Sequence, residues 1–443
     1  MKRPAKKGGS QALVIDPYVP GSGNFGYRVS RYDLDLEYKV ASHRLTGTAN
    51  ITAVTLASLR AFTLDLSDSL TVSKVLVNGR RPAHFATSGG KLRIKLDAAL
   101  PPGAALSVVV RYGGSPHPIN SLWGTVGFEE LSNGALVAGQ PNGSPSWFPC
   151  DDHPSAKASY RIAISTDSPY RALSNGELVS RRVRAAQTDW TFEQPEPTST
   201  YLVTLAIGNY VDHRLPKAPV AMAAVLPERL RSNFDHDFAR QPSMMKLFIK
   251  LFGPYPFAAG YTVVVTDDDL EIPLEAQGIS IFGANHCDGT RSHERLIAHE
   301  LAHQWFGNSV TARRWRDIWL HEGFACYAEW LWSEHSGGPT ADELARRHHE
   351  RLSDAPQDLL LTDPGAPDMF DDRVYKRGAL TLHVLRGVVG DGSFFDLLRE
   401  WTTRHRHGTV VTDDFTGMAA NYAQVSLRPL WDAWLYSTEV PPL

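Results

Sequence analysis

The sequence predicts a multidomain protein, in which an all-β domain of antiparallel sheet precedes an α+β domain that is mostly helical. The chain has 443 residues, which is too many for one ordinary hydrophobic core. In its first half, apolar residues recur at every second position, which is the period of a half-buried strand. After residue 211 the apolar spacing becomes that of amphipathic helices. We therefore expect an N-terminal β domain over residues 21–211 and a second domain over residues 212–443.

The strands of the first domain are marked by this alternation and by turn residues. In RYDLDLEYKV, the residues Tyr32, Leu34 and Leu36 alternate with charged residues. Asn78 and Gly79 form a turn of the hairpin type. The short strands continue in KLRIKL, LSVVVRY, ASYRIAIS and TYLVTLAIGNY. Together they predict an open antiparallel sheet or a sandwich.

The second domain begins with mixed elements and continues with helices. The segment PSMMKLFIKLFGPYPF predicts a helix that ends at Gly253 and Pro254, and YTVVVTDDD and GISIFGA predict two strands. Thr340 and Glu343 form a capping box that opens a further helix. Amphipathic helices follow in GALTLHVLRGVV, FFDLLREWTTRH and RPLWDAWLYS.

The composition is that of a soluble globular protein, with 42% hydrophobic and 21% charged residues. A formal net charge of −3 argues against a nucleic-acid surface, and no apolar stretch reaches the roughly 18 residues that span a bilayer. The basic start MKRPAKKGGSQ lacks a following apolar segment, so we expect a disordered tail over residues 1–20, or else an arm for anionic partners. Cys150, Cys287 and Cys326 form no C-x-x-C motif, so we expect reduced thiols in a cytoplasmic protein.

One stretch, IAHELAHQWFGNSV, places three polar groups that are costly to bury inside an apolar run. We expect a helix that is capped by Ser292 and runs to about Phe306. His299 and His303 are four residues apart, so they present two imidazoles to one metal ion. Glu300 is rotated by about 100° from His299, which puts it beside the ion, where it can take a proton from a bound water.

A third metal ligand is expected from the next helix. Glu322 follows His303 after 18 intervening residues, near the start of a helix that begins about Ile318. Two histidines and one glutamate leave a fourth position for water, as in catalytic zinc sites. Burying three unpaired groups of this kind would cost several kcal/mol, which argues against a chance occurrence. A structural zinc is disfavoured, because such sites usually close with four Cys or His ligands.

These residues resemble a known family. HELAHQWFGNSVTARRWRDIWLHEGFA is similar to the zinc signature of the aminopeptidase N family, a gluzincin family of zinc metallopeptidases that also contains the leukotriene hydrolases. Four further segments of the chain also resemble the short two-domain form of this family: SWFPCDDHPSAKASYRIAIS, STYLVTLAIGNY, VYKRGALTLHVL and WLYSTEVPPL. The resemblance implies a saddle-shaped β domain and a thermolysin-like catalytic domain. It also implies that His299, His303 and Glu322 bind zinc, that Glu300 is the general base and that Tyr375 hydrogen-bonds the oxyanion. From the residues alone, Tyr375 would be a capping or surface tyrosine.

The sequence departs from the family in the segment that binds the substrate amine. IPLEAQGISIF stands where the family has Gly-x-Met-Glu-Asn, so Glu275 falls on the motif glutamate and Ala276 replaces the asparagine. The resemblance implies that Glu275 binds the substrate α-ammonium, and a surface carboxylate is the alternative. Gln140 stands where many members have glutamate, and its carbonyl would be a second, weaker contact for the amine. Asp317 fits either a carboxylate that holds a zinc-binding histidine or the N-cap of the second helix.

The resemblance implies a zinc-dependent aminopeptidase, with one zinc per chain, that removes single residues from peptide N-termini. The alternatives are a zinc endopeptidase with relaxed N-terminal recognition, an epoxide hydrolase and an inactive zinc-bearing binding protein. We expect peptide substrates, no nucleic-acid or membrane partner, a monomer and a cytoplasmic location. Because the resemblance ends with the catalytic domain, we also expect an open site with little control of peptide length.

Overall fold

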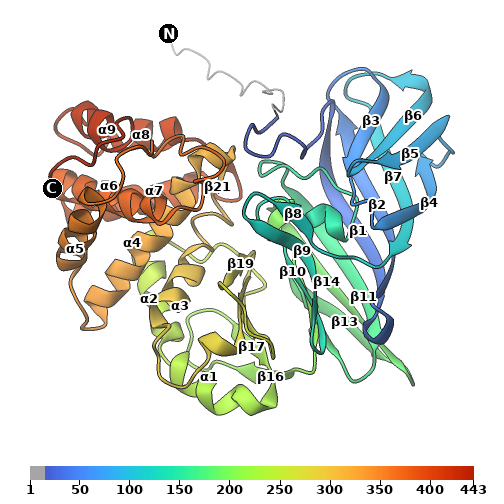
Figure 1. Cartoon of the computed structure of the whole chain (residues 1–443), viewed down its shortest axis with the longest axis horizontal. Coiled ribbons are helices and arrows are strands. Elements are labelled where there is room, and N and C mark those ends of the chain that lie inside the picture. The colour runs from blue at the N-terminus through green and yellow to red at the C-terminus, as the bar shows by residue number, and fades with distance from the viewer. Residues whose placement is uncertain (1–14) are drawn as a thin grey trace, which may run out of the picture.

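The computed structural model describes residues 15–443, and within them two units lie side by side (Figure 1). Strands from the first half of the chain form one unit, and the helices gather in the other. The predicted fold class is confirmed. The predicted tail of residues 1–20 falls mostly on residues 1–14, which lie outside the described residues. The predicted boundary between residues 211 and 212 stays a prediction, although the first strand of the second unit's sheet begins at Val211.

Three sheets build the N-terminal unit. They have the strand orders β13-β14-β11-β1-β2-β7-β4, β3-β6-β5 and β12-β15-β10-β9-β8. The strands are β1 (Tyr27–Lys39), β2 (Arg44–Thr55), β3 (Leu59–Asp65), β4 (Leu70–Val77), β5 (His84–Ser88), β6 (Lys91–Leu100), β7 (Ala105–Gly114), β8 (Ile119–Ser121), β9 (Gly124–Leu131), β10 (Gly134–Ala138), β11 (Ala158–Asp167), β12 (Arg171–Ser174), β13 (Glu177–Val183), β14 (Gln187–Thr198) and β15 (Leu205–Gly208).

The predicted alternation in the first strand is confirmed, since Tyr32, Leu34 and Leu36 are all buried. The large sheet differs from the antiparallel expectation at one pair, because β1 and β11 run parallel. Strands β2 to β10 lie between these two in the chain. An excursion of that length lets β11 return in the direction of β1, which a tight hairpin cannot do.

The second unit combines one mixed sheet with nine α-helices in the described part of the chain. The strand order is β16-β17-β18-β20-β19, and a small pair, β21-β22, lies apart. The strands are β16 (Val211–Arg214), β17 (Met222–Leu226), β18 (Tyr261–Val265), β19 (Leu274–Ala276), β20 (Ile279–Phe282), β21 (Thr311–Ala312) and β22 (Thr409–Val410). The helices are α1 (Arg231–Asp237), α2 (Gln241–Phe252), α3 (Glu294–Ala302), α4 (Trp319–His335), α5 (Ala341–Ser353), α6 (Asp372–Val389), α7 (Asp391–Arg404), α8 (Thr412–Ala419) and α9 (Arg428–Trp434).

The mixed sheet connects the two units because both of its faces are buried. Val264 of β18 and Ile281 of β20 pack into the core of the β domain. Val263 and Val265, the neighbours of Val264 on β18, pack into the helical core instead. Successive side chains of a strand point to opposite faces, so continuous apolar runs are what a strand between two cores requires. This sheet fixes α3 and β19 against the N-terminal unit.

Two predicted helix caps can be compared with the structure. The cap of α5 is as predicted, and the cap of α3 is not. Thr340 and Glu343 form the predicted box, since the Thr340 Oγ1 accepts from the Glu343 N–H at 3.2 Å and the Glu343 Oε2 accepts from the Thr340 N–H at 2.8 Å. Ser292 does not cap α3, because its hydroxyl donates to Asp288 at 2.7 Å. The helix begins at Glu294 and ends at Ala302, earlier than the predicted end near Phe306.

The described residues that precede β1 are packed against the second unit. The Asp16 Oδ2 accepts a hydrogen bond from the Trp315 N–H at 2.7 Å, and the Tyr18 hydroxyl donates to Asp363 at 2.6 Å. Asp16 and Tyr18 are buried. The part of the predicted tail that the structure describes is therefore ordered. Between residues 15 and 443, no helix is both long and apolar enough to cross a membrane.

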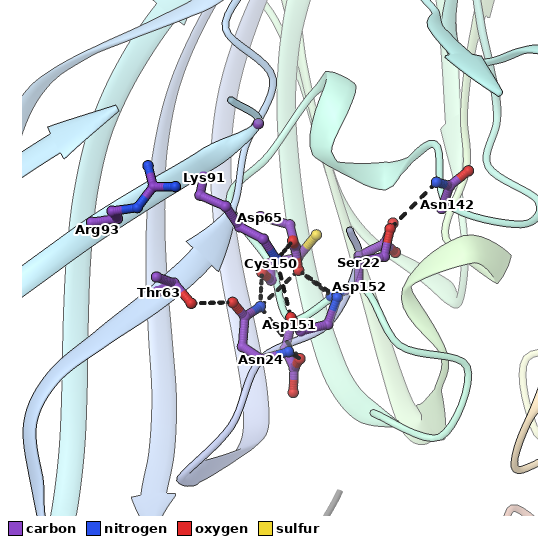
Figure 2. Close-up of polar contacts among 12 residues, drawn as sticks. Ser22, Asn24, Thr63, Asp65, Lys91, Arg93, Asn142, Cys150, Asp151 and Asp152 are labelled. Carbon is purple, nitrogen blue, oxygen red and sulfur yellow. Dashed lines mark hydrogen bonds and ion pairs between the residues drawn. The ribbon is translucent and has the colours of Figure 1, made fainter. Parts of the chain in front are cut away.

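A buried polar cluster ties the segment before β1 to the sheets of the β domain (Figure 2). The Asn24 amide donates to Asp65 at 2.7 Å, and the Asn24 N–H donates to Asp151 at 2.9 Å. The Asp152 N–H also donates to Asp65, at 3.0 Å. The Lys91 ammonium forms an ion pair with Asp65. The cluster thus holds three acidic side chains and one cation, which pairs with Asp65, and burial raises the pKa of the Asp151 carboxyl to about 7.

Replacing Lys91 with methionine is expected to destabilise the protein by about 3–5 kcal/mol, because the buried Asp65 loses its cation. Urea unfolding followed by circular dichroism measures this change in the free energy of unfolding. The control is Lys95→Met on the same strand, where the lysine is exposed and the expected effect is below about 0.5 kcal/mol. Equal losses in the two variants would show that the ion pair with Asp65 contributes nothing.

Candidate metal centre

The two histidines of the predicted motif lie at the C-terminal end of α3. His299 is in its last turn and His303 is its C-cap. The centroids of the two rings are 4.7 Å apart, and the ring planes are inclined by 80°. Glu322, in the first turn of α4, approaches both: its Oε2 is 3.4 Å from the Nε2 of His299 and 3.4 Å from the Nε2 of His303. All three side chains are buried.

His299, His303 and Glu322 form a donor set that fits a zinc ion. Donor atoms that bind a tetrahedral ion at about 2.0–2.1 Å stand about 3.3–3.4 Å from one another. The separations of 3.4 Å between Glu322 and each histidine match that spacing. Two imidazole nitrogens and one carboxylate oxygen are also the donor types of catalytic zinc sites, which keep one position for water.

The outer hydrogen bonds fix which nitrogen of each histidine faces the ion. The His299 Nδ1 lies 2.7 Å from the Glu329 carboxylate, and the His303 Nδ1 lies 3.0 Å from the Phe306 carbonyl. Both partners can only accept, so each Nδ1 carries the proton and donates. In the neutral ring, each Nε2 then keeps its lone pair on the side that faces Glu322. This is the tautomer that metal binding needs.

Glu329 is the residue that the sequence analysis missed at this centre. It lies on α4 seven residues after Glu322, which is two helical turns further along the same face. Its carboxylate is 3% exposed and also accepts from Arg295 at 3.0 Å. The hydrogen bond from His299 and the charges around it hold the pKa of the Glu329 carboxyl near 2, although burial acts in the opposite direction. The i+7 spacing was the signal that could have found it.

Glu300 lies beside the donor set. This is the position that the sequence predicted from the rotation of Glu300 about the helix axis relative to His299. Its side chain is 4% exposed, and its Oε2 has no hydrogen-bond partner in residues 15–443. Burial raises the pKa of the Glu300 carboxyl to about 7, although the two neighbouring histidines lower it. A ligand atom of Glu300 lies within 4.8 Å of ligand atoms of Glu275 and His303.

Glu275 is therefore part of the same centre. Hydrogen bonds join its strand, β19, to the turn that follows α3. The carbonyl of Ala276 accepts from the Gln304 amide at 3.1 Å and from the Asn308 amide at 2.9 Å. Both donors belong to the turn that follows α3. The Gln304 carbonyl oxygen also accepts from the Gly278 N–H at 2.8 Å. These hydrogen bonds hold β19 in place without the motif asparagine that Ala276 replaces.

Tyr375 lies in the first turn of α6 and packs against the centre. Its ring stacks on His299, with 6.0 Å between the centroids and 21° between the planes. Burial raises the pKa of the Tyr375 phenol, and the Glu322 carboxylate adds to this effect, so the phenol stays a hydrogen-bond donor. Gln140 lies after β10, and its amide nitrogen is buried with no partner among the described residues. No hydrogen bond of the described residues joins Gln140 to Glu275.

Two neighbouring residues serve the fold instead of the ion. Asp317 neither contacts a zinc-binding histidine nor caps α4, because its Oδ1 accepts from the N–H and the hydroxyl of Thr412 at the start of α8. Both readings from the sequence are wrong for Asp317. The Nε2 of His321, the residue before Glu322, accepts from the Ala312 N–H at 2.6 Å. Burial lowers the pKa of His321 to about 3, so the ring is neutral.

Tyr201 is a second residue that the sequence analysis did not connect with the site. It stands at the end of the β domain, and its ring packs on Trp315 with centroids 4.9 Å apart. Its hydroxyl is buried without a partner in the described part of the chain. Burial raises the pKa of the Tyr201 phenol, and the charges of Glu275 and Glu322 act in the same direction. Only the tertiary fold brings it near these carboxylates.

Comparison with known proteins decides the family. Residues 29–202 match the Peptidase M1 N-terminal domain, and residues 253–434 match the Peptidase family M1 domain. Together the two matches cover more than half of the chain. The chain belongs to the M1 peptidase family. The M1 match to the second domain includes all three residues of the donor set, His299, His303 and Glu322.

Curated relatives in this family are longer proteins. "Aminopeptidase N" of Lactococcus lactis subsp. lactis is 26% identical over 319 residues, which are 66% of this chain and 38% of that protein. "Glutamyl aminopeptidase" of Sus scrofa is 26% identical over 71% of this chain and 36% of its own length. The matched part of the chain thus spans less than half the length of these M1 relatives.

Solved structures of similar length also resemble this M1 chain. The M1 zinc metallopeptidase from Deinococcus radiodurans superimposes with a TM-score of 0.88 at 28% identity, and the match covers 98% of this chain and 99% of that one. A mutant of that protein has been solved with a Tyr-Ser-Ala substrate, with the same TM-score of 0.88. The two-domain architecture is therefore shared with M1 metallopeptidases over nearly the whole chain.

Proposed function

We propose that this M1 chain is a zinc-dependent aminopeptidase that removes single residues from the N-termini of peptides. The observation that carries the proposal is the gathering of Glu275 and Glu300 within 4.8 Å of a ligand atom of His303, beside the donor set. An aminopeptidase needs these two carboxylates for different tasks. One binds the substrate ammonium, and the other moves a proton.

His299, His303 and Glu322 would hold one zinc ion per chain. When bound, the ion supplies Lewis acidity toward water and toward the scissile carbonyl. The support from the chain is the 3.4 Å spacing between Glu322 and each histidine, together with the hydrogen bonds that place the proton of each imidazole on Nδ1. The zinc metallopeptidases with the same architecture support the choice of metal.

Glu300 would act as the general base and then as the general acid. It takes a proton from the attacking water and passes it to the amine of the leaving peptide. Its unpartnered Oε2 is available for this transfer. Tyr375 would donate a hydrogen bond from its phenol to the carbonyl oxygen as negative charge develops there. The stacking of its ring on His299 supports that placement.

Glu275 would restrict cleavage to the first peptide bond of the substrate. Its carboxylate binds the free α-ammonium by charge-assisted hydrogen bonds, so the scissile bond is the first one of the peptide. Gln140 would add a weaker, uncharged contact through its amide carbonyl. The hydrogen bonds from Gln304 and Asn308 to the strand of Glu275 support a fixed distance between the ammonium site and the metal ligands.

We further infer a cytoplasmic location and activity as a monomer. The three cysteines are free and buried, which suits a reducing compartment. All residues of the proposed site come from one chain, so a second copy is not required for the chemistry.

The purified protein is expected to contain one zinc per chain and to release N-terminal residues one at a time from peptides with a free amine. A chelator should abolish the activity and added zinc should restore it, because the ion is held only by His299, His303 and Glu322. Metal analysis and chromatography of the products measure both. The control is the same peptide with an acetylated N-terminus, which should be a poor substrate. Absence of stoichiometric zinc would refute the metal site, and internal cleavage of the acetylated peptide at a similar rate would make the protein an endopeptidase.

A further inference from the structure

A lysine of the β domain reaches across to the turn that follows α3. Lys157 directly precedes β11, and its ammonium donates to the carbonyls of Asn308 and Ser309, each at 2.9 Å. It also donates to the carbonyl of Gly408, just before β22, at 3.4 Å. An ammonium has three N–H donors, so these three carbonyls satisfy it completely. Lys157 therefore joins the β domain to two segments of the second unit.

This lysine is held without a carboxylate partner. Within residues 15–443, no acidic side chain forms an ion pair with Lys157. Burial lowers the pKa of its ammonium to about 7, so the charged form is costly to keep at this place. A methionine would fill the same space without that cost. The hydrogen bonds to the carbonyls are therefore what a lysine contributes here and an apolar side chain cannot.

The turn that Lys157 binds also holds the strand of Glu275. The Asn308 amide donates at 2.9 Å to the carbonyl of Ala276, the residue that follows Glu275 on β19. The Asn308 N–H donates to the His303 carbonyl at 3.0 Å. Asn308 thus stands between Lys157, the strand of the proposed ammonium site and the metal-binding segment.

The three carbonyls differ in the partners that remain if the lysine is lost. The Asn308 carbonyl also accepts from the Thr311 hydroxyl at 3.3 Å, and the Gly408 carbonyl accepts from the Thr311 N–H at 3.1 Å. Among the described residues, the Ser309 carbonyl has no hydrogen-bond donor other than Lys157. Ser309 is buried, so the turn must shift or admit a water to satisfy this carbonyl without the lysine. Such a shift reaches β19 through Asn308.

We propose that Lys157 is a positioning residue for substrate recognition, which fixes Glu275 relative to the metal ligands through Asn308. The inference rests on the proposed aminopeptidase function, in which Glu275 binds the substrate ammonium. The ammonium is not altered in the reaction, so its contact with Glu275 contributes equally to the ground state and the transition state. A displaced Glu275 therefore raises KM more than it lowers kcat.

The metal ligands are fixed by other contacts, which predicts that zinc stays bound without the lysine. The His299 Nδ1 is held by Glu329, and the His303 Nδ1 is held by the Phe306 carbonyl. Lys157 contacts none of these residues among the described hydrogen bonds. The zinc content therefore separates an effect on Glu275 from an effect on the metal.

Lys157→Met is expected to raise KM for an amino-acid amide about tenfold, the size of one hydrogen bond to a charged group, with a change in kcat below about threefold. Zinc should stay at one ion per chain, and the circular dichroism spectrum should match that of the wild-type protein. The assays are run below pH 7, where the ammonium is the main form of Lys157. The matched control is Lys95→Met, because Lys95 is an exposed lysine of the β domain, and it should keep the wild-type KM.

Asn308→Leu tests the route of the effect and keeps the inference testable if Lys157→Met fails to fold. It removes the amide that donates to the Ala276 carbonyl and leaves the backbone carbonyls that Lys157 binds. Its KM should also rise. The double variant should have the KM of the more affected single variant, because both changes break the same path.

An unchanged KM in Lys157→Met or in Asn308→Leu would overturn the inference. So would loss of zinc from Lys157→Met, or a double variant in which the two effects on KM multiply. The aminopeptidase proposal would stand in all of these cases, because the wild-type protein still releases N-terminal residues. A wild-type protein that releases none would refute the proposed function and this inference with it.

Discussion

Replacing Glu300 with glutamine is expected to lower kcat by about 10²–10⁴-fold, the usual contribution of a general base. Glutamine keeps the shape of the side chain but cannot accept the proton of the attacking water. Glu300 is not part of the donor set, in which Glu322 stands 3.4 Å from each of the two histidines, so zinc should stay bound at one ion per chain. Steady-state kinetics on a free-amine peptide, together with metal analysis of the same sample, measures both quantities.

The zinc content separates loss of chemistry from loss of the metal. A variant without zinc would mean that Glu300 holds the ion or the fold of α3, and it would leave the base unassigned. A variant with zinc and near-normal kcat would assign the base to another group. Because the lost interaction acts on a proton transfer, KM should change far less than kcat.

The sequence predicted the parts of this site that depend on helical geometry. Residues four apart on a helix share a face, so His299 and His303 were expected to lie together, and the structure places their rings 4.7 Å apart. The approach of Glu322 was expected because it lies near the start of the next helix, 18 intervening residues after His303. The end of α3 could not be predicted in the same way. The His303 imidazole and the turn at Gly307, with a φ of +117°, decide it through contacts that no periodicity encodes.

Contacts between segments far apart in sequence were also beyond prediction. Tyr201 approaches the carboxylates of the site only because the mixed sheet packs against the β domain. Asp317 looked like a cap or a metal-site carboxylate, yet it binds Thr412, which is 95 residues away. A local pattern cannot distinguish these roles, because each needs the same kind of side chain at the start of a helix. Tertiary packing selects one of them.

Replacing Glu275 with glutamine is expected to lower kcat/KM on amino-acid amides by about 30- to 100-fold, which corresponds to about 2–3 kcal/mol for a lost charge-assisted hydrogen bond. The free ammonium of the substrate then meets an uncharged amide. No other acid stands in the IPLEAQG segment, and Gln140 offers only a carbonyl. The strand itself should not move, because the Ala276 carbonyl still accepts from Gln304 and Asn308.

Glu271→Gln is the matched control, since Glu271 lies four residues earlier, is exposed and is absent from the candidate metal-ligand groups of the described residues. Kinetics on free and N-acetylated forms of one peptide should then give a simple pattern. The wild-type protein and the control prefer the free form strongly, whereas Glu275→Gln loses most of that preference because the ammonium no longer finds a carboxylate. If the wild-type protein already cuts both forms at similar rates, the ammonium takes no part in recognition. If Glu275→Gln keeps the full preference, another group binds the amine, and the buried, unpartnered amide of Gln140 is the first side chain to replace.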